Sequence, residues 1–201
     1  MEINTLEALR QHYPAAQGRA VLKQIGRLDR HCLDFLALSP FVVLSTCDQQ
    51  FNLDASPRGG EPGFVKVGAE GQLLIPDAPG NNRLDSLENI VATGKVGLLF
   101  MIPGFDETLR INGDAVLSMA PQDIAACTTE RRAPKVVVKV TVTAAYLHCA
   151  KAFLRSKLWA DASRIDRSVL PTVGQMISDQ TGVHAVPETK EAMEQRYAPD
   201  L

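Results

Sequence analysis

The sequence predicts an α+β protein, mainly β, whose core is an antiparallel β-barrel with helices outside it. Three observations support this. Short β-rich runs follow one another through the middle of the chain with mostly brief connections, helical patterns occupy both ends, and 201 residues suit one domain. Strands this close in sequence pair antiparallel, and a closed or nearly closed barrel removes their free edges. We expect a single domain over 1–201.

The N-terminal segment, about 1–40, is expected to be helical. Leu6, Leu9 and Tyr13 share one face of a first helix, and Pro14 interrupts that pattern. A further apolar stripe at helical spacing then runs as far as Pro40, where a helix must stop.

The barrel is expected over about 41–145, as a series of short strands. The strongest is 95–102, and 51–56 alternates apolar and polar residues as a half-buried strand does. The run at 135–142 is expected to be the sixth or seventh strand. Short helices are expected at 83–91 and 121–127. The expected strands are 41–46, 51–56, 64–67, 73–75, 95–102, 108–117 and 135–142.

From about 146 to 201 the pattern returns to helix and loop. Helices are expected at 148–159 and 172–180, followed by a polar amphipathic end at 187–197. No internal repeat or linker divides the chain.

Composition excludes several classes of protein. The formal net charge is −2, which argues against a surface made for nucleic acid or for a membrane. The N-terminus lacks the features of a signal peptide, and the longest apolar run is about half of the ~20 residues that a membrane span needs. We therefore expect a soluble, cytoplasmic protein. The four cysteines have no metal-ligand spacing, so we expect no metal site.

Motifs for the common catalytic classes are absent from the sequence. The four histidines are scattered, and neither a nucleophile elbow, nor a P-loop, nor a G-x-G-x-x-G motif is present. Hydrolase and kinase functions therefore lack support, and no catalytic residue is assigned.

Two segments are hard to dismiss as plain loops. Arg58 follows Ser56 and Pro57 where the proline is expected to end a strand, although a plain turn with a solvated arginine remains an alternative. Asn81 and Asn82 lead into a helix start that places Arg83 in the first turn. A cation there opposes the helix dipole, so Arg83 is not there for helix stability and suits a phosphate instead.

A third segment, 107–113, carries polar side chains on one face of a strand. Thr108, Arg110 and Asn112 share this face. A ligand contact, a polar barrel face and a dimer contact all remain open.

Together these segments resemble a known family. Four motifs occur in the same order as in the pyridoxamine 5'-phosphate oxidase-like, FMN-binding split-barrel proteins, and more narrowly in a branch of FMN-dependent proteins whose substrate is unknown. The resemblance covers roughly 30–160. The motifs are Ala55-Ser56-Pro57-Arg58-Gly59, the stretch from Pro76-Asp77 through Gly80-Asn81-x-Arg83 to Asn89-Ile90, Val96 to Gly104, and Glu107 to Ala115.

The resemblance implies a six-stranded antiparallel split barrel with flanking helices. It also implies a homodimer with FMN in clefts at the subunit interface. Basic residues would hold the phosphate, the strand that includes Ile75 would run beside the isoalloxazine ring, and a polar residue would approach its pyrimidine edge. Carried onto this sequence, the implied FMN-binding residues are Ser56, Pro57, Arg58, Ile75, Pro76, Asp77, Asn81, Asn82, Arg83 and Thr108.

A segment further along also resembles this branch. His148, Lys151 and Arg155 lie at helical spacing, and Trp159 follows four residues later. We expect Arg155 and Trp159 to approach the flavin or the substrate from the partner subunit. Packing of Trp159 in the core or at the dimer interface is the alternative.

The resemblance implies an FMN-dependent oxidoreductase that acts on an unidentified small molecule, with a nicotinamide nucleotide, NAD(P)H, as the expected reductant. The C-terminal arginine and histidine set of true pyridoxamine 5'-phosphate oxidases is missing, so vitamin B6 oxidation is not expected. A non-catalytic flavin- or haem-binding module is the alternative, with His148, His31 or Cys149 as the candidate axial ligand. A purely structural protein would leave the arginine loops unexplained.

Overall fold

The computed structural model describes residues 2–183 and 188–200. Its strands are β1 (Phe41–Cys47), β2 (Leu53–Gly59), β3 (Lys66–Val67), β4 (Leu73–Pro76), β5 (Lys95–Met101), β6 (Thr108–Ser118) and β7 (Val137–His148). Its α-helices are α1 (Leu6–His12), α2 (Arg19–Leu22), α3 (Arg30–Leu38), α4 (Asp85–Thr93), α5 (Pro121–Cys127), α6 (Lys151–Ser156), α7 (Val173–Thr181) and α8 (Lys190–Tyr197). Three 3₁₀ turns, Asp161–Ser163, Arg167–Val169 and Ala198–Asp200, lie beyond α6.

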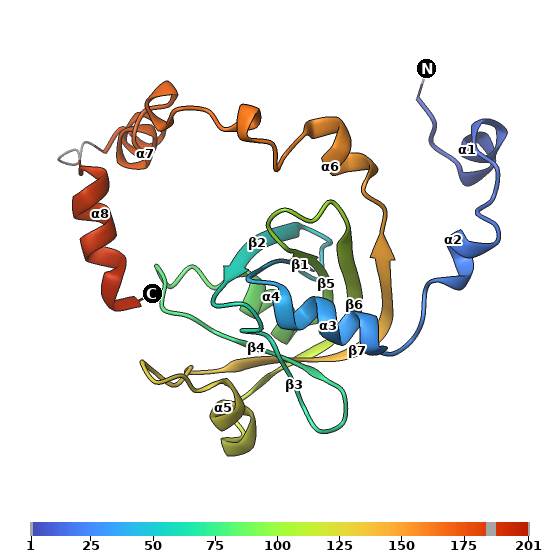
Figure 1. The fold of residues 1–201 in the computed structure, drawn as a ribbon, viewed down its shortest axis with the longest axis horizontal. Coiled ribbons are helices and arrows are strands. Elements are labelled where there is room, and N and C mark those ends of the chain that lie inside the picture. Colours follow the sequence, from blue (N-terminus) through green and yellow to red (C-terminus); the bar gives the residue numbers. More distant parts are fainter. Residues whose placement is uncertain (1, 184–187, 201) are drawn as a thin grey trace.

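The strands form one antiparallel sheet that curls into a half-barrel (Figure 1). Their order is β2-β1-β5-β6-β7-β4-β3. The expected split-barrel class is confirmed. The number of strands is seven rather than the six that the resemblance implied, because the two-residue β3 pairs with β4 at one edge of the sheet.

The core lies inside the curled sheet. Alternate residues of β1 face inward, so Val42 and Leu44 are completely buried, and Phe100 of β5 is buried beside them. Helix α3 covers this core with Phe35 and Leu36, and its first turn is capped by the carboxylate of Asp29. The strands expected at 41–46 and 95–102 therefore correspond to β1 and β5 in the middle of the sheet.

Strand β2 differs from expectation in two ways. Pro57 does not end it: the strand continues to Gly59, with Pro57 opposite Val43. Since β2 is an edge strand, a residue without an N–H group can sit there without breaking an inner ladder. In addition, its polar residues Ser56 and Arg58 are half-buried, whereas Leu53 is 86% exposed.

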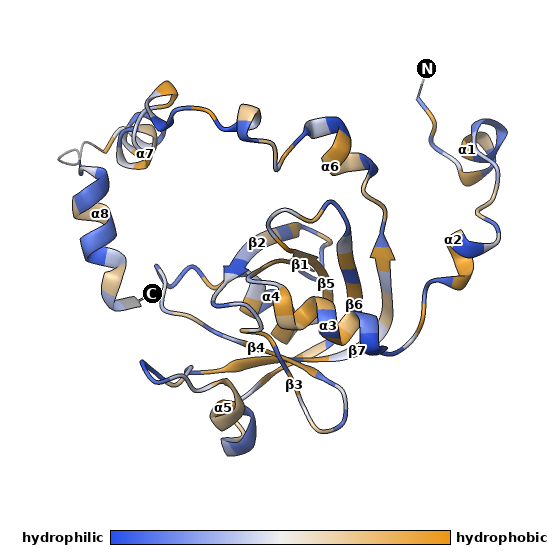
Figure 2. Ribbon diagram, in the orientation of Figure 1, coloured by the Kyte–Doolittle hydropathy of each residue, from blue (hydrophilic) through white to orange (hydrophobic). Residues whose placement is uncertain are grey.

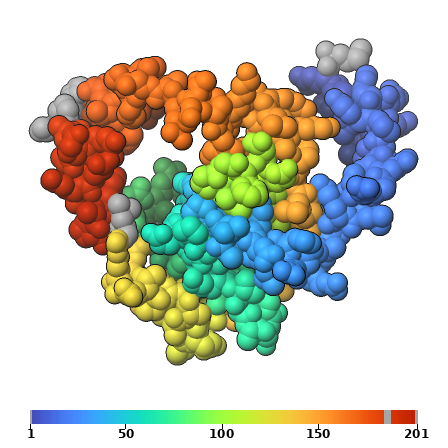
Figure 3. All heavy atoms as spheres, viewed as in Figure 1, coloured from blue at the N-terminus to red at the C-terminus, as the bar shows by residue number. Residues whose placement is uncertain are grey.

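Both ends of the chain leave the barrel as extended arms (Figure 1). Helices α1, α2, α6 and α8 contain no buried residue. Figure 2 shows apolar positions along both arms, and Figure 3 shows open space between the barrel and the arc formed by α6 to α8. The exposed apolar side chains of the arms include Leu6, Leu22, Leu154, Ile165, Val169, Val173 and Ile177.

The helices near the C-terminus were predicted with mixed success. The expected helix at 172–180 corresponds to α7, but the one at 148–159 is wrong in extent, because His148 is the last residue of β7 and pairs with Thr108. Helix α6 covers only Lys151–Ser156. Lys157, the residue that follows it, has a left-handed backbone conformation that stops the helix. Of the expected 187–197 helix, α8 accounts for Lys190–Tyr197, and Pro187 lies outside the described residues.

Within the part of the chain that the structure describes, every helix is too short or too polar to cross a membrane.

Candidate functional site

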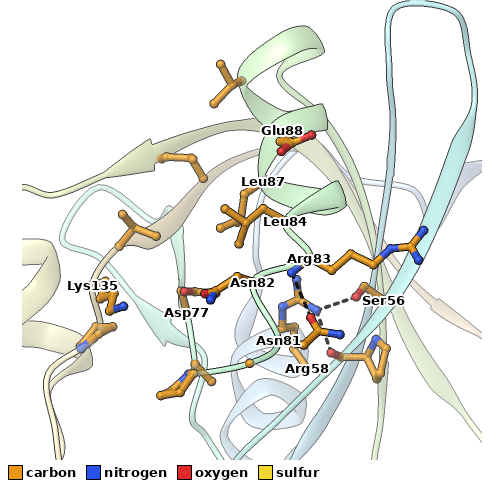
Figure 4. A pocket seen from close by; sticks show the side chains of 18 of the residues that line it. Ser56, Arg58, Asp77, Asn81, Asn82, Arg83, Leu84, Leu87, Glu88 and Lys135 are labelled. Atoms are coloured by element: carbon orange, nitrogen blue, oxygen red, sulfur yellow. Dashed lines mark hydrogen bonds between the residues drawn. The ribbon is translucent and has the colours of Figure 1, made fainter. Parts of the chain in front are cut away.

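A cavity of about 840 Å³ opens beside the end of β2 (Figure 4). The loop before α4 and the first turns of that helix form one wall, and the segment that leads into β7 forms another. This cavity brings together the predicted residues Ser56, Pro57, Arg58, Asp77, Asn81, Asn82 and Arg83.

Arg58 is held by its own strand. Its Nη1 atom donates hydrogen bonds to Ser56 Oγ at 2.8 Å and to the carbonyl of Pro57 at 2.9 Å. The side chain is half-buried, and it makes no ion pair with a carboxylate of residues 2–183 or 188–200. Its positive charge is therefore available to an anion in the cavity.

Arg83 occupies a different position from the one expected. Helix α4 begins at Asp85, with Leu84 as its N-cap, so Arg83 precedes the helix and does not lie in its first turn. Asp85 takes that place, where a negative charge is favourable, and it accepts a hydrogen bond from Arg83 Nε at 2.5 Å. This contact raises the pKa of the Arg83 guanidinium. Figure 4 shows Arg83 directed away from Lys135 and Asp77.

The loop before α4 has a defined shape. The side chain of Asn81 accepts a hydrogen bond from the backbone N–H of Arg83 at 3.0 Å, and Asn82 has a φ of 59°. Asparagine tolerates this left-handed conformation better than most residues. The two asparagines therefore turn the chain toward the helix and keep their amides at the cavity.

Side-chain hydrogen bonds attach α4 to the sheet. Ser86 Oγ donates to Asp54 Oδ2 at 2.6 Å, and Asn89 Nδ2 donates to Thr46 Oγ1 at 3.0 Å. A third bond joins Thr93 Oγ1 to the carbonyl of Cys47 at 3.0 Å. These bonds position the loop before α4 relative to Arg58, although the two segments are far apart in sequence.

The cavity combines cationic groups with an apolar wall. Leu87 and Val91 of α4 line it, together with Leu84 just before that helix, Leu117 of β6 and Val136 just before β7. Ligand sites commonly have volumes of roughly 300–1,000 Å³ and mix apolar walls with a few polar groups. This arrangement suits a ligand with a flat or apolar body and a negatively charged end.

Three charged residues of the cavity were missed by the sequence analysis: Glu88, Arg132 and Lys135. The sequence analysis treats Lys135 only as the start of a strand and assigns no role to Arg132 or Glu88. The signal that could have found them is the concentration of basic residues at Arg131, Arg132 and Lys135.

Ile75, Pro76 and Thr108 lie outside the cavity lining. Ile75 is in the core, at 1% exposed, and Pro76 is half-buried at the end of β4, which leads directly to Asp77. Thr108 is buried at the start of β6. The role expected for these three residues beside the flavin ring stays a prediction.

Arg155 and Trp159 also lie outside the cavity of their own chain. Trp159 Nε1 donates to the carbonyl of Phe105 at 2.7 Å, and its ring stacks on Phe153 with centroids 5.6 Å apart. A second, smaller cavity lies between Trp159, Leu158 and Pro103. The expected approach of Arg155 and Trp159 to a partner's flavin stays a prediction.

Asp123 anchors α5, the helix that precedes the Arg132 segment. Its carboxylate accepts a hydrogen bond from Ser118 Oγ at 2.6 Å and pairs with Lys139 Nζ at 3.3 Å. The Ser118 hydroxyl, and to a lesser degree Lys139, lower the pKa of Asp123. The stabilisation is therefore complete above the ordinary aspartate pKa of about 3.9, and it is lost as the pH falls through the lowered pKa of the folded state.

We expect the free energy of unfolding to fall less steeply between pH 5 and pH 2 in Asp123→Asn than in the unmodified protein. Ser118→Ala, which removes the main cause of the shift, should give an intermediate slope. Urea unfolding at several pH values measures this. Identical slopes in all three proteins would show that the contacts of Asp123 contribute nothing to acid stability.

The fold and the cavity define a class: a split-barrel protein with a cavity lined by basic and apolar side chains. A family model described as pyridoxamine 5'-phosphate oxidase matches residues 28–149, more than half of the chain. The chain therefore belongs to the pyridoxamine 5'-phosphate oxidase family.

Solved structures with a similar fold include a HupZ variant from Group A Streptococcus, which is 14% identical at a TM-score of 0.49, with 60% of this chain and 98% of that chain covered. A protein from Clostridium acetobutylicum related to general stress protein 26 is 11% identical at a TM-score of 0.40. The match covers 59% of this chain and 87% of that chain. HutZ, the haem storage protein of Vibrio cholerae, is 13% identical at a TM-score of 0.39. The match covers 58% of this chain and 89% of that chain. Among curated proteins, none matches this chain.

Proposed function

We propose that the protein binds FMN in this cavity and acts as an FMN-dependent oxidoreductase on a small molecule. The observation that carries the proposal is the half-buried Arg58, which has no carboxylate partner among the described residues and lines a cavity that also has an apolar wall. Membership of the pyridoxamine 5'-phosphate oxidase family supports the choice of a flavin.

The residues present fit FMN. Arg58 can bind a phosphate through two parallel hydrogen bonds, and Ser56, Asn81 and Asn82 offer neutral polar groups beside it. Arg83 adds charge at the rim, although Asp85 takes part of its hydrogen-bonding capacity. The apolar side chains of α4 suit the ring system of a flavin.

When bound, FMN would supply electron and hydride transfer, and the protein residues would bind and orient it. We assign no residue of this chain as a proton donor, because hydride can pass directly to or from the flavin. Arg58 and Ser56 would hold the phosphate, and α4 would exclude water from the apolar side of the cavity. A nicotinamide nucleotide is the proposed reductant.

A homodimer is part of the proposal. Its support is the apolar surface that a single chain leaves uncovered, on the outer face of β2 and along both arms. Leu53 at the start of β2, 86% exposed, and Phe51 just before that strand, 80% exposed, are the most exposed of these side chains. A second copy would bury such side chains and could complete the open side of the site.

The visible absorption spectrum tests the proposed function. We expect added FMN to bind with a shifted flavin spectrum, and NADPH under anaerobic conditions to bleach the flavin bands. Bound flavin that fails to bleach with NADPH but does so with dithionite would contradict NADPH as the reductant. Failure to bind FMN at all would contradict the cofactor assignment.

One observation favours a haem-binding module as the second candidate. His148 is half-buried at the end of β7, and burial, followed by the charges of Arg110 and Lys23, lowers its pKa. Its imidazole is therefore neutral near pH 7, as a haem ligand must be. In that case added haem would give a Soret band that His148→Ala removes, and FMN would not bind.

A further inference from the structure

A buried serine joins the first turn of α4 to strand β2. Ser86 is only 3% exposed, and its Oγ atom donates a hydrogen bond to Asp54 Oδ2 at 2.6 Å. Asp54 shares a face of β2 with Ser56 and Arg58, because alternate residues of a strand point to the same side. Unlike those two residues, Asp54 does not line the cavity. A carboxylate therefore lies beside the proposed phosphate site without entering it.

The guanidinium of Arg83 lies near two carboxylates. Figure 4 shows its side chain extending toward the strand that carries Ser56, which is also the strand of Asp54. The hydrogen bond and the charge of Asp85 are the main causes of the raised pKa of Arg83, and the charge of Asp54 adds to them. Asp54 therefore acts on Arg83 electrostatically, although no hydrogen bond or ion pair joins the two side chains.

Asp54 could compete with a phosphate group for Arg83. A guanidinium binds carboxylates and phosphates in the same way, through two parallel hydrogen bonds. The Nε atom of Arg83 already donates to Asp85. If a second carboxylate also bound the terminal nitrogens, Arg83 would have few donors left for a phosphate, and its charge would be neutralised.

The hydrogen bond from Ser86 opposes this competition. Asp54 would lose that bond if its carboxylate turned toward Arg83, and the buried hydroxyl of Ser86 would lose its acceptor. The start of α4 also favours the observed position, because the N-terminal end of a helix stabilises a nearby negative charge. The N-cap residue, Leu84, makes no side-chain hydrogen bond to this turn. The carboxylate of Asp54 is thus held at the helix and away from the guanidinium.

We propose that Ser86 is a positioning residue for the phosphate site: by holding Asp54, it keeps this carboxylate from pairing with Arg83, so that the terminal nitrogens of Arg83 stay available to the phosphate of FMN. This inference rests on the proposed FMN-dependent function and adds a residue that controls the charge of its phosphate site.

Fluorescence titration of FMN compares Ser86→Ala with the double variant Ser86→Ala/Asp54→Asn. In Ser86→Ala the carboxylate of Asp54 is released to pair with Arg83, and we expect the Kd for FMN to rise three- to fivefold. In the double variant the released side chain has no charge, so the Kd should return to within twofold of that of the unmodified protein. A purely structural role of the Ser86–Asp54 bond would not give this recovery, because the double variant does not restore the bond.

Asn89→Ala is the matched control. It removes another hydrogen bond between α4 and the sheet, from Asn89 Nδ2 to Thr46 Oγ1, without releasing a carboxylate. We expect it to change the Kd for FMN less than twofold. The inference would be overturned by an equal loss of affinity in Asn89→Ala and Ser86→Ala, by an unchanged Kd in Ser86→Ala, or by the absence of recovery in the double variant.

Chemical modification by phenylglyoxal tests the same pairing without FMN. The Arg83 side chain is 77% exposed, so the reagent can reach it, and mass spectrometry of peptides follows its modification. We expect Ser86→Ala to slow the modification of Arg83 at least threefold and the double variant to restore the rate. Arg30, on the exposed surface of α3, should react alike in all proteins. Equal rates at Arg83 in all proteins would contradict the proposed pairing.

These measurements separate the inference from the proposed function. If the unmodified protein does not bind FMN, the proposed function fails, and the modification rates of Arg83 judge the inference alone. If Ser86→Ala does not fold, Asp54→Asn decides, because it removes the charge and keeps the shape of the side chain. It should speed the modification of Arg83 and raise the Kd for FMN less than twofold, whereas a fivefold rise would overturn the inference.

Discussion

Arg58→Met is expected to weaken FMN binding at least tenfold. Methionine keeps much of the apolar stem of the side chain but removes its charge and its donors. Each hydrogen-bonded contact between a charged group and its partner contributes about 1.5–3 kcal/mol, and about 1.4 kcal/mol corresponds to a tenfold change in Kd. Fluorescence titration of FMN into the folded variant measures the effect.

Arg83→Met should weaken FMN binding less than Arg58→Met. The Arg83 side chain is 77% exposed and is already hydrogen-bonded to Asp85, whereas Arg58 is half-buried without a carboxylate partner among the described residues. Arg30→Met, a change on the exposed surface of α3, serves as the control for a lost positive charge. If Arg58→Met behaves like Arg30→Met, the phosphate site is assigned to the wrong residue.

Gly113→Ala is expected to destabilise the barrel by about 1–3 kcal/mol, in the range of overpacking substitutions. A Cβ atom at Gly113 would lie 2.5 Å from the carbonyl oxygen of Thr141 and 2.6 Å from Cγ1 of Val140. The first of these is a backbone atom, so a rotamer change cannot relieve the contact. The pairing of β6 with β7 also shifts register between Asn112 and Gly113, which brings the two strands close there.

Gly97→Ala is the matched control on the neighbouring strand. A Cβ atom there would lie 3.6 Å from Asn112 Oδ1, an ordinary contact. Thermal unfolding should show a lower Tm for Gly113→Ala by roughly 2–4 °C per kcal/mol, and a much smaller change for Gly97→Ala. Similar losses in both variants would mean that the cost comes from replacing a strand glycine and not from the close approach at Gly113.

Local patterns in the sequence predicted most of the barrel. The β-rich run at 41–46 predicted β1, and Pro121 marked the start of α5. These features depend on neighbouring residues, because the period of a strand and the restrictions on proline act within a few positions. The resemblance to the family then indicated that Arg58 and the Asn81–Arg83 loop share a site.

Long-range pairing decided what those patterns could not. The edge position of β2 allows Pro57 inside a strand, and pairing with Thr108 keeps His148 in β7 instead of a helix. Such outcomes depend on which distant segment supplies the hydrogen-bond partner, and a local window does not contain that partner.

The sequence by itself determined the fold class, the strand positions and the arginine-bearing segments of the site. Only the tertiary structure decided that the α5–β7 connection reaches the same cavity, and that the Nη1 atom of Arg132 is buried without a hydrogen-bond partner among the described residues. The physical reason is that burial and hydrogen-bond satisfaction belong to the packed chain: the same arginine in an open loop would be solvated and its charge satisfied by water.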